Sequence, residues 1–217
     1  MKHAILSFSI VAMTMTHGYS QLLFQITGGV SPKSNPVSAG VFINRHLPHE
    51  EFVFNMHEVK PQVYAGMKAR VELEGPFFMD VGLKYTKRTS TYHLEYTMID
   101  FEHPVSDYFM TESDHVLLLP VNIGVSLGAL NVTSGLRGMR SIFRNNDLNQ
   151  LTGFSGSSYP IYFGFQGGIT YQIGRSGVGV EYYGNFSRVG SGMSVNGQSL
   201  ELMNVPGQFL LTIQHNL

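Results

Sequence analysis

The sequence predicts an all-β protein: an eight-stranded antiparallel up-and-down transmembrane β-barrel, with short turns at one rim and long loops at the other. Three observations favour this fold class. Eight stretches carry apolar residues at every second position, their connections alternate between long and short, and only 13% of all residues are charged. Barrels of the outer membrane join their strands by short periplasmic turns and long extracellular loops, so consecutive connections must differ in length.

The first residues have the features of an export signal. Lys2 provides a positive start, residues 4–15 are mostly apolar, and Gly18 and Ser20 are small residues near a possible cleavage point. We therefore predict a signal peptide over residues 1–20. The alternative is a buried N-terminal helix, but a run this short with these flanks fits a signal peptide better.

Residues 21–217 are predicted to form one outer-membrane β-barrel domain. About 197 residues suffice for one all-β domain, and no Pro/Ser-rich linker divides them. Without Lys2 they contain 13 Lys and Arg against 15 Asp and Glu, which offers no basic field to nucleic acid. The chain has no cysteine, so disulfides and a lipidated cysteine are excluded. We expect no nucleic-acid partner and no cofactor.

The predicted strands follow from the alternation of two residue classes. In chain order they cover about 22–30, 63–73, 77–86, 116–127, 130–137, 163–173, 178–186 and 208–217. The first and last strands are predicted to meet, because closure removes the exposed edges of the sheet. The short turns are predicted at Glu74-Gly75-Pro76, at Gly128 and at Gly174-Arg175-Ser176.

Four long segments are predicted as solvent-facing loops, because they are rich in His, Asp, Asn, Ser and Gly. They cover roughly residues 31–61, 89–114, 138–158 and 190–206. In the last one, Asn196-Gly197 predicts the tip of a type I′ hairpin. Part of that loop is therefore expected to extend the barrel.

The residue types on the two faces of the strands predict which face contacts lipid. The polar face is rich in glycine, which suits a narrow interior. These glycines are Gly66, Gly82, Gly124, Gly135, Gly164, Gly168 and Gly179. On the apolar face, Phe77 and Tyr85 span nine positions, the length of a tilted membrane strand between two aromatic girdles. We predict that the apolar face is outside. A soluble periplasmic lipocalin-like ligand-binding barrel would have the reverse orientation and is the alternative.

This orientation points seven charged side chains into the lumen: Lys68, Arg70, Glu72, Asp80, Lys84, Arg137 and Glu181. Unpaired charges are costly in a narrow core, so we predict a nearly neutral network of ion pairs and hydrogen bonds. Such a lumen is a plug rather than an open pore.

Short motifs of the chain resemble a known family. They are Val63-Tyr64-Ala65-Gly66-Met67, Val81-Gly82-Leu83-Lys84-Tyr85, Leu117-Leu118-Leu119-Pro120-Val121 and the junction Gly18-Tyr19-Ser20-Gln21. They resemble the PorT-like outer-membrane β-barrel proteins of Bacteroidota and, more loosely, the OmpA-type eight-stranded barrels. The resemblance implies an integral protein of a Gram-negative outer membrane. Because the member that names the family assists protein secretion, it also implies an accessory of secretion as one possible role.

Catalytic and metal-binding chemistry is only weakly indicated. Imidazoles and carboxylates occur together from His46 to Glu51, but Pro48 prevents the regular helix that would align a zinc-type pair. We expect no metal site there, and a solvated loop instead.

A lipid A modifying outer-membrane enzyme is the alternative function. Its one concrete version uses Ser134, with Glu181, Ser187 and His215 as partners. The predicted strand positions separate these residues, and there is no G-x-S-x-G motif. We therefore predict that the protein is not an enzyme.

The remaining candidate for function is binding by the loops. The second long segment contains several aromatic residues, a type that is enriched in interfaces. The candidate contacts are Tyr92, Tyr96, Phe101, Tyr108 and Phe109. We expect outer-membrane lipid and envelope or secretion proteins as partners of a monomeric barrel. The alternative is that these aromatic residues only pack the loops against each other.

Overall fold

The structure, a computed structural model, describes residues 22–34, 39–43, 50–98, 106–150, 154–156, 162–186, 193–195, 198–199 and 207–217. The predicted signal peptide, the predicted tip at Asn196-Gly197 and Phe101 lie outside the described residues. Within the described ranges, no helix is long and apolar enough to cross a membrane.

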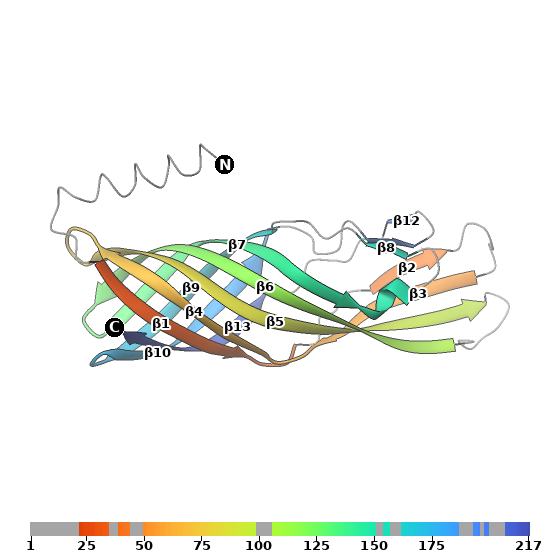
Figure 1. The fold of residues 1–217 in the computed structure, drawn as a ribbon, viewed down its shortest axis with the longest axis horizontal. Helices are drawn as coiled ribbons and strands as arrows, with labels where there is room; N and C mark the ends of the chain where they lie inside the picture. The colour runs from red at the N-terminus through yellow and green to blue at the C-terminus, as the bar shows by residue number, and fades with distance from the viewer. Residues whose placement is uncertain are drawn as a thin grey trace.

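Eight antiparallel strands form a closed barrel (Figure 1). Around the ring they are β1 (Leu22–Ser31), β4 (Gln62–Glu72), β5 (Phe77–Met98), β6 (Ser106–Leu127), β7 (Leu130–Asn146), β9 (Tyr162–Ile173), β10 (Ser176–Asn185) and β13 (Gln208–Asn216). The pairing of β1 with β13 closes the ring, from Gln25↔Asn216 to Val30↔Leu211. The predicted fold class, an all-β up-and-down barrel of eight strands, is confirmed.

The three short turns lie at one end of the barrel, which we call the turn rim. Each contains a glycine with a positive φ, a backbone conformation that other residues rarely adopt: Gly75 at 72°, Gly128 at 64° and Gly174 at 61°. The amide of Leu217 donates to the carbonyl of Phe24 over 2.9 Å, so the start of β1 and the end of β13 share this rim. The positions of all three predicted turns are confirmed, although the second is formed by Gly128 and Ala129 together.

At the opposite end, one side of the barrel extends much farther along the barrel axis than the rest (Figure 1). Here β3 (Glu50–Val59) continues the line of β4 and pairs with the distal half of β5, and β2 (Ala39–Ile43) pairs with β3. The long halves of β5 and β6 pair as far as Tyr96↔Ser106. We call β2, β3, residues 87–98 of β5 and residues 106–115 of β6 the extended wall.

The extended wall corrects the prediction that residues 89–114 form a loop. Residues 89–98 and 106–114 are strands, and only the short stretch between them lies outside the described residues. The physical reason is cross-strand pairing. Thr89 lies opposite Ser113, and Thr91 lies opposite Thr111. Ser and Thr are common in loops, but their side chains also form favourable cross-strand pairs in a sheet.

The predictions of loops over residues 31–61 and 138–158 are also corrected in part, because β3 covers residues 50–59 and β7 continues to Asn146. The remaining parts of the long segments contain short elements. A separate three-stranded sheet consists of β8 (Phe154–Gly156), β11 (Met193–Val195) and β12 (Gln198–Ser199), and the 3-10 helix η2 (Asp147–Gln150) follows β7. Val195 pairs with Gln198, so β11 and β12 are antiparallel neighbours in this sheet.

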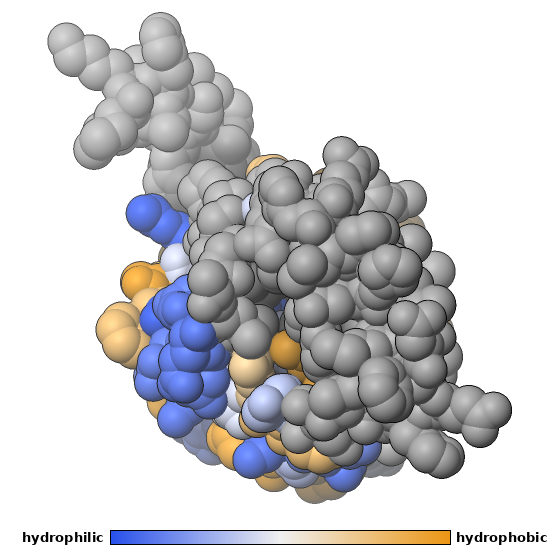
Figure 2. Space-filling model, turned by 90° about the vertical axis from the view of Figure 1, so that its right-hand side faces the viewer, coloured by the Kyte–Doolittle hydropathy of each residue, from blue (hydrophilic) through white to orange (hydrophobic). Residues whose placement is uncertain are grey.

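The apolar face of the strands points outward and the polar face inward, as predicted. Val63, Ile123 and Ile213 are 65–69% exposed, whereas Gln25 and Asp80 are at most 2% exposed. In the end view of Figure 2, apolar side chains lie along the outer edge of the molecule beside polar ones. The orientation of a lipocalin-like barrel, with its apolar face hidden, is therefore not the one observed.

The glycines of the inner face lie where the barrel wall has no room for a side chain. A Cβ on Gly66 would lie 2.2 Å from the carbonyl oxygen of Leu83, and one on Gly135 would lie 2.1 Å from that of Val121. Both distances are far below any real contact, so neighbouring backbones approach more closely than an alanine allows. The expectation that space is tight on this face is confirmed.

Near the turn rim, Gly124 makes room for the buried ring of Phe78. A Cβ on Gly124 would lie 2.2 Å from that ring. We expect Gly124→Ala to lower the free energy of unfolding by about 1–3 kcal/mol, because the ring must move within a filled interior. Urea titration of the refolded barrel, followed by circular dichroism, measures this loss.

Gly138→Ala is the matched control. Its Cβ would meet nothing nearer than 4.0 Å, and it should leave the urea midpoint nearly unchanged. Equal midpoints for the two variants would contradict the packing argument.

Candidate functional site

The lumen is the candidate functional site, since the inward side chains meet there in successive layers from the turn rim towards the extended wall. Alternation along β5 places Phe78, Asp80, Lys84, Thr86 and Arg88 on the inner face in that order. Each layer is completed by inward residues from other strands.

In the layer nearest the turn rim, one carboxylate serves two cations. Asp80 on β5 lies opposite Arg70 on β4. Its Oδ1 accepts from Arg70 Nε over 2.9 Å, and its Oδ2 accepts from Arg70 Nη2 and from Lys68 Nζ, both over 3.2 Å. The Arg70 guanidinium also lies 3.6 Å from the ring centroid of Phe78. Asp80 is 2% exposed, so these pairs are shielded from water.

The next layer joins opposite parts of the barrel. Lys84 Nζ on β5 lies 2.7 Å from Glu181 Oε2 on β10, although these strands are not neighbours in the ring. Lys84 also donates to the hydroxyl of Tyr183 over 3.0 Å, and that hydroxyl donates to Glu181 over 2.6 Å. This three-residue cluster therefore spans the lumen.

Two of the seven predicted residues differ from the others. Arg137 has no carboxylate partner in the described part of the chain: it donates to Asn185 Oδ1 over 2.6 Å and stacks 4.3 Å from the ring centroid of Tyr183. Glu72, half-buried near the turn rim, forms no ion pair with any described residue. The structure thus brings five of the seven into ion pairs, namely Lys68, Arg70, Asp80, Lys84 and Glu181.

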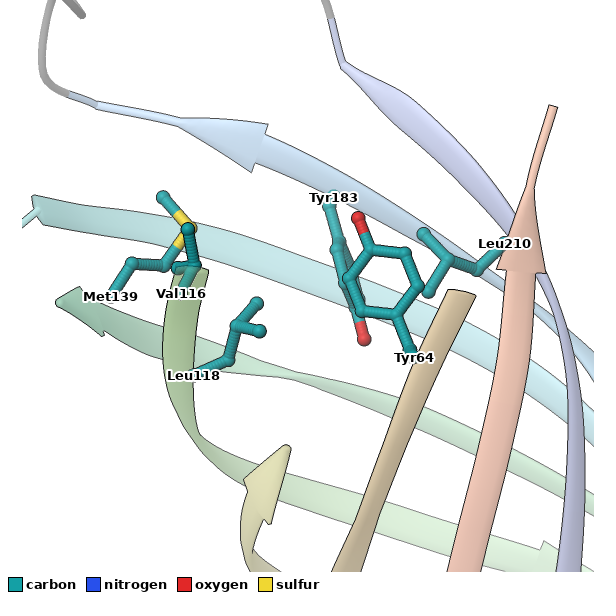
Figure 3. Close-up of a cluster of buried hydrophobic side chains, with 6 residues drawn as sticks. All are labelled: Tyr64, Val116, Leu118, Met139, Tyr183 and Leu210. Carbon is teal, nitrogen blue, oxygen red and sulfur yellow. The ribbon is translucent and has the colours of Figure 1, made fainter. Parts of the chain in front are cut away.

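On the side of this cluster that faces the extended wall lies an apolar layer that was not predicted from the sequence. Its members are Tyr64, Val116, Leu118, Met139, Tyr183 and Leu210, which gather inside the barrel (Figure 3). The rings of Tyr64 and Tyr183 meet edge to face, with centroids 6.0 Å apart. The signal was present: Tyr64 and Leu118 occupy the same alternating phase as the polar lumen residues.

A second charged cluster fills the inner face where the extended wall begins. Arg88 Nη2 lies 2.6 Å from Asp114 Oδ2, and Arg144 Nε lies 2.8 Å from both Asp114 Oδ1 and Glu112 Oε1. Burial raises the pKa of Asp114, but the hydrogen bonds and charges of Arg144 and Arg88 outweigh it, so this pKa lies below its ordinary value. Two arginines and two carboxylates make this cluster neutral.

Tyr92 belongs to that cluster and not to the surface. It lies on β5, is 2% exposed, and its hydroxyl donates to Glu112. Burial, followed by the negative charge of Glu112, raises the pKa of Tyr92 well above its ordinary value. The prediction that Tyr92 is a loop contact is corrected, because alternation along β5 turns its side chain inward.

The other predicted contacts are distributed over the extended wall. Tyr108 and Phe109 on β6 are 52% and 60% exposed, and Phe109 stacks on His93 with ring centroids 4.7 Å apart. Tyr96 lies on β5, but its side chain is outside the described part, as is all of Phe101.

The residues weighed for catalysis and metal binding do not assemble in the described structure. Ser134 is exposed on the outer surface, whereas Glu181 lies in the lumen, so the barrel wall separates them. His215 pairs with Ser176 over 3.0 Å near the turn rim, and Ser187 is not described. In the described ranges, no group of three or more His, Cys, Asp or Glu is arranged to hold a metal. His46, Pro48 and His49 lie outside these ranges, and Glu50 and Glu51 begin β3.

The Asp80 layer predicts a large loss of stability in Asp80→Asn. Removal of this carboxylate leaves Lys68 and Arg70 buried without their counter-charge, which we expect to cost about 3–5 kcal/mol of unfolding free energy. The urea midpoint measures it. Glu74→Gln is the control, because it removes the charge of an exposed carboxylate in the first turn. It should change the urea midpoint little.

The cluster around Asp114 predicts a loss of local stability in acid. Because the folded pKa of Asp114 is lowered, its stabilisation is complete above the ordinary carboxyl pKa of 3.8 and is lost as the pH falls through the lower folded value. Amide hydrogen exchange in residues 88–95, corrected for intrinsic rates, should accelerate on acidification below that pH. Asp114→Asn should already exchange fast at neutral pH and show little further change. An acid response in the variant as large as in the native chain would contradict this assignment.

Comparisons with known proteins support the fold. No family model matches the chain. No curated protein matches its sequence either, so the PorT-like resemblance stays a prediction. Among solved structures, the chain is similar to the outer membrane protein OprG from Pseudomonas aeruginosa, with a TM-score of 0.51 and 11% identity over 92% of this chain and 98% of that one. At this identity the similarity shows an eight-stranded barrel fold.

Proposed function

We propose that this chain is an integral outer-membrane β-barrel protein with a closed lumen, which acts as a structural or binding protein and not as an open pore or an enzyme. In this proposal residues 1–20 direct export, and the turn rim faces the periplasm of a Gram-negative bacterium. The observation that carries the proposal is an outer belt of exposed apolar side chains around a polar, filled interior.

The belt has the dimensions and composition of a lipid-facing surface. Along β5 its outward residues run from Phe77 to Tyr85, which are 52% and 41% exposed and span the nine positions of a tilted membrane strand. Aromatic rings gather away from the turn rim: Tyr182 lies 5.9 Å from Phe165 and 5.0 Å from Phe209 between centroids. Aromatic girdles of this kind flank the apolar band of membrane barrels. The similarity in fold to an outer membrane protein supports the same location.

The lumen layers support a closed barrel. The Lys84–Glu181 pair crosses the interior. Tyr64, Tyr183 and Leu118, each at most 4% exposed, narrow the lumen on the side of the extended wall. A path for ions through such an interior would require these side chains to move together. The extended wall is then the part available for binding, with Tyr108 and Phe109 as exposed aromatic contacts for an envelope or secretion protein.

Two measurements test this proposal. The protein should sediment with outer membranes, and its gel mobility should differ between unboiled and boiled samples, because a folded barrel resists detergent. In planar bilayers it should give no stable ohmic conductance. Tyr64→Ala/Tyr183→Ala, which removes both rings of the apolar layer, should conduct measurably.

Recovery of the native protein in the soluble periplasmic fraction would exclude a membrane location. Stable, large conductance of the native barrel would exclude a closed lumen, whatever its location. A further variant lacks residues 99–105, the connection between β5 and β6. If this variant still binds envelopes, the binding surface lies on the strands of the extended wall and not on that connection.

A further inference from the structure

The lumen contains a small cavity between the Lys84 cluster and the extended wall, with a volume of about 30 Å³. Its lining residues are Gln62, Tyr64, Thr86, Arg88, Val116, Leu118, Arg137, Met139, Tyr183, Asn185 and Gln208. Among these described residues there are two guanidinium groups and no carboxylate. Positive charges inside a lumen carry a desolvation cost unless an anion compensates them.

The charges around the cavity are unequal. Arg88 has its counter-charge in Asp114, 2.6 Å away. Within the described ranges, Arg137 donates only to neutral oxygens, those of Asn185 and Gly184. Nearer the turn rim, Lys84 and Glu181 balance each other. Lys68 and Arg70 share the single carboxylate of Asp80, which leaves that layer positive as well.

Some polar side chains that line the cavity have hydrogen-bond donors without an acceptor. Gln62 uses its Oε1 to accept from the Tyr64 hydroxyl over 2.8 Å. Among the residues that the structure describes, neither the Nε2 of Gln62 nor the Nε of Arg137 has a hydrogen-bond partner. Gln62 is 3% exposed and Arg137 is 5% exposed, so bulk water does not satisfy them. Unpaired buried donors next to uncompensated positive charge are complementary to an anion.

We infer that this cavity binds a small monovalent inorganic anion of halide size, held by Arg137 and Gln62. The volume accommodates about one or two water molecules, which suits a halide and excludes bulky organic acids. The bound anion neutralises Arg137 and accepts from the unpaired donors. Because the site is formed by the lumen itself, this inference does not depend on whether the barrel conducts or in which membrane it resides.

Anion-dependent thermal stability tests the inference. The native barrel, refolded in detergent micelles, is heated in sodium chloride and in sodium gluconate at equal sodium concentration, since gluconate is too large for the cavity. Chloride should raise the Tm in a saturable way, by roughly 3 °C when its concentration is about ten times Kd. Arg137→Gln should abolish the difference between the two salts.

Arg140→Gln is the matched control, because Arg140 lies on the same strand but is exposed on the outer face. It should keep the chloride response. Equal Tm values for the native barrel in both salts, or an unchanged response in Arg137→Gln, would overturn the inference and assign the cavity to water only.

A measurement on the native chain keeps the test valid if Arg137→Gln does not fold. Crystals grown in sodium bromide should show an anomalous peak within hydrogen-bonding distance of Arg137 and Gln62. Absence of a peak there would overturn the site. A barrel that conducts but responds to chloride would refute the closed lumen alone, so the two proposals fail separately.

Discussion

The narrow interior of an eight-stranded barrel constrains every inward side chain, and the rest of the structure depends on this constraint. Inward positions therefore include glycines without a side chain, paired charges and packed rings. Gly66 and Gly135 have no side chain where backbones approach each other. Asp80 pairs with Arg70 and Glu181 pairs with Lys84, where water has little access. A filled, polar interior and an apolar exterior are two results of the same closure.

Much of the fold was predictable, because closure imposes a period of two residues with a different environment on each face. The alternation over residues 63–73 and 77–86 predicted both strands, and the turn between them, with Gly75 at positive φ, follows from its sequence. The same phase identified Arg70, Asp80 and Lys84 as inward. Their partners were not predictable in detail, since the contact of Lys84 with Glu181 depends on the geometry across the lumen and not on sequence spacing.

The extended wall and the apolar layer escaped prediction for different reasons. The distal halves of β5 and β6 are rich in Ser, Thr, His and Asp, and this composition suggests a loop until the cross-strand partners are known. Tyr92 was consequently assigned to the surface, although it is buried. Leu118 and Tyr64 were on the correct face, but the expectation of a uniformly polar lumen concealed their clustering.

The two ion-pair layers have very different separations along the chain, which places them at different stages of barrel assembly. Lys68 and Arg70 are 12 and 10 residues from Asp80, so the β4–β5 hairpin forms this layer by itself. Lys84 and Glu181 are 97 residues apart, and their pair forms only after β10 has arrived. The Lys84–Glu181 pair is therefore an interaction of the assembled barrel alone, whereas the Asp80 layer is already available to an open sheet that contains the β4–β5 hairpin.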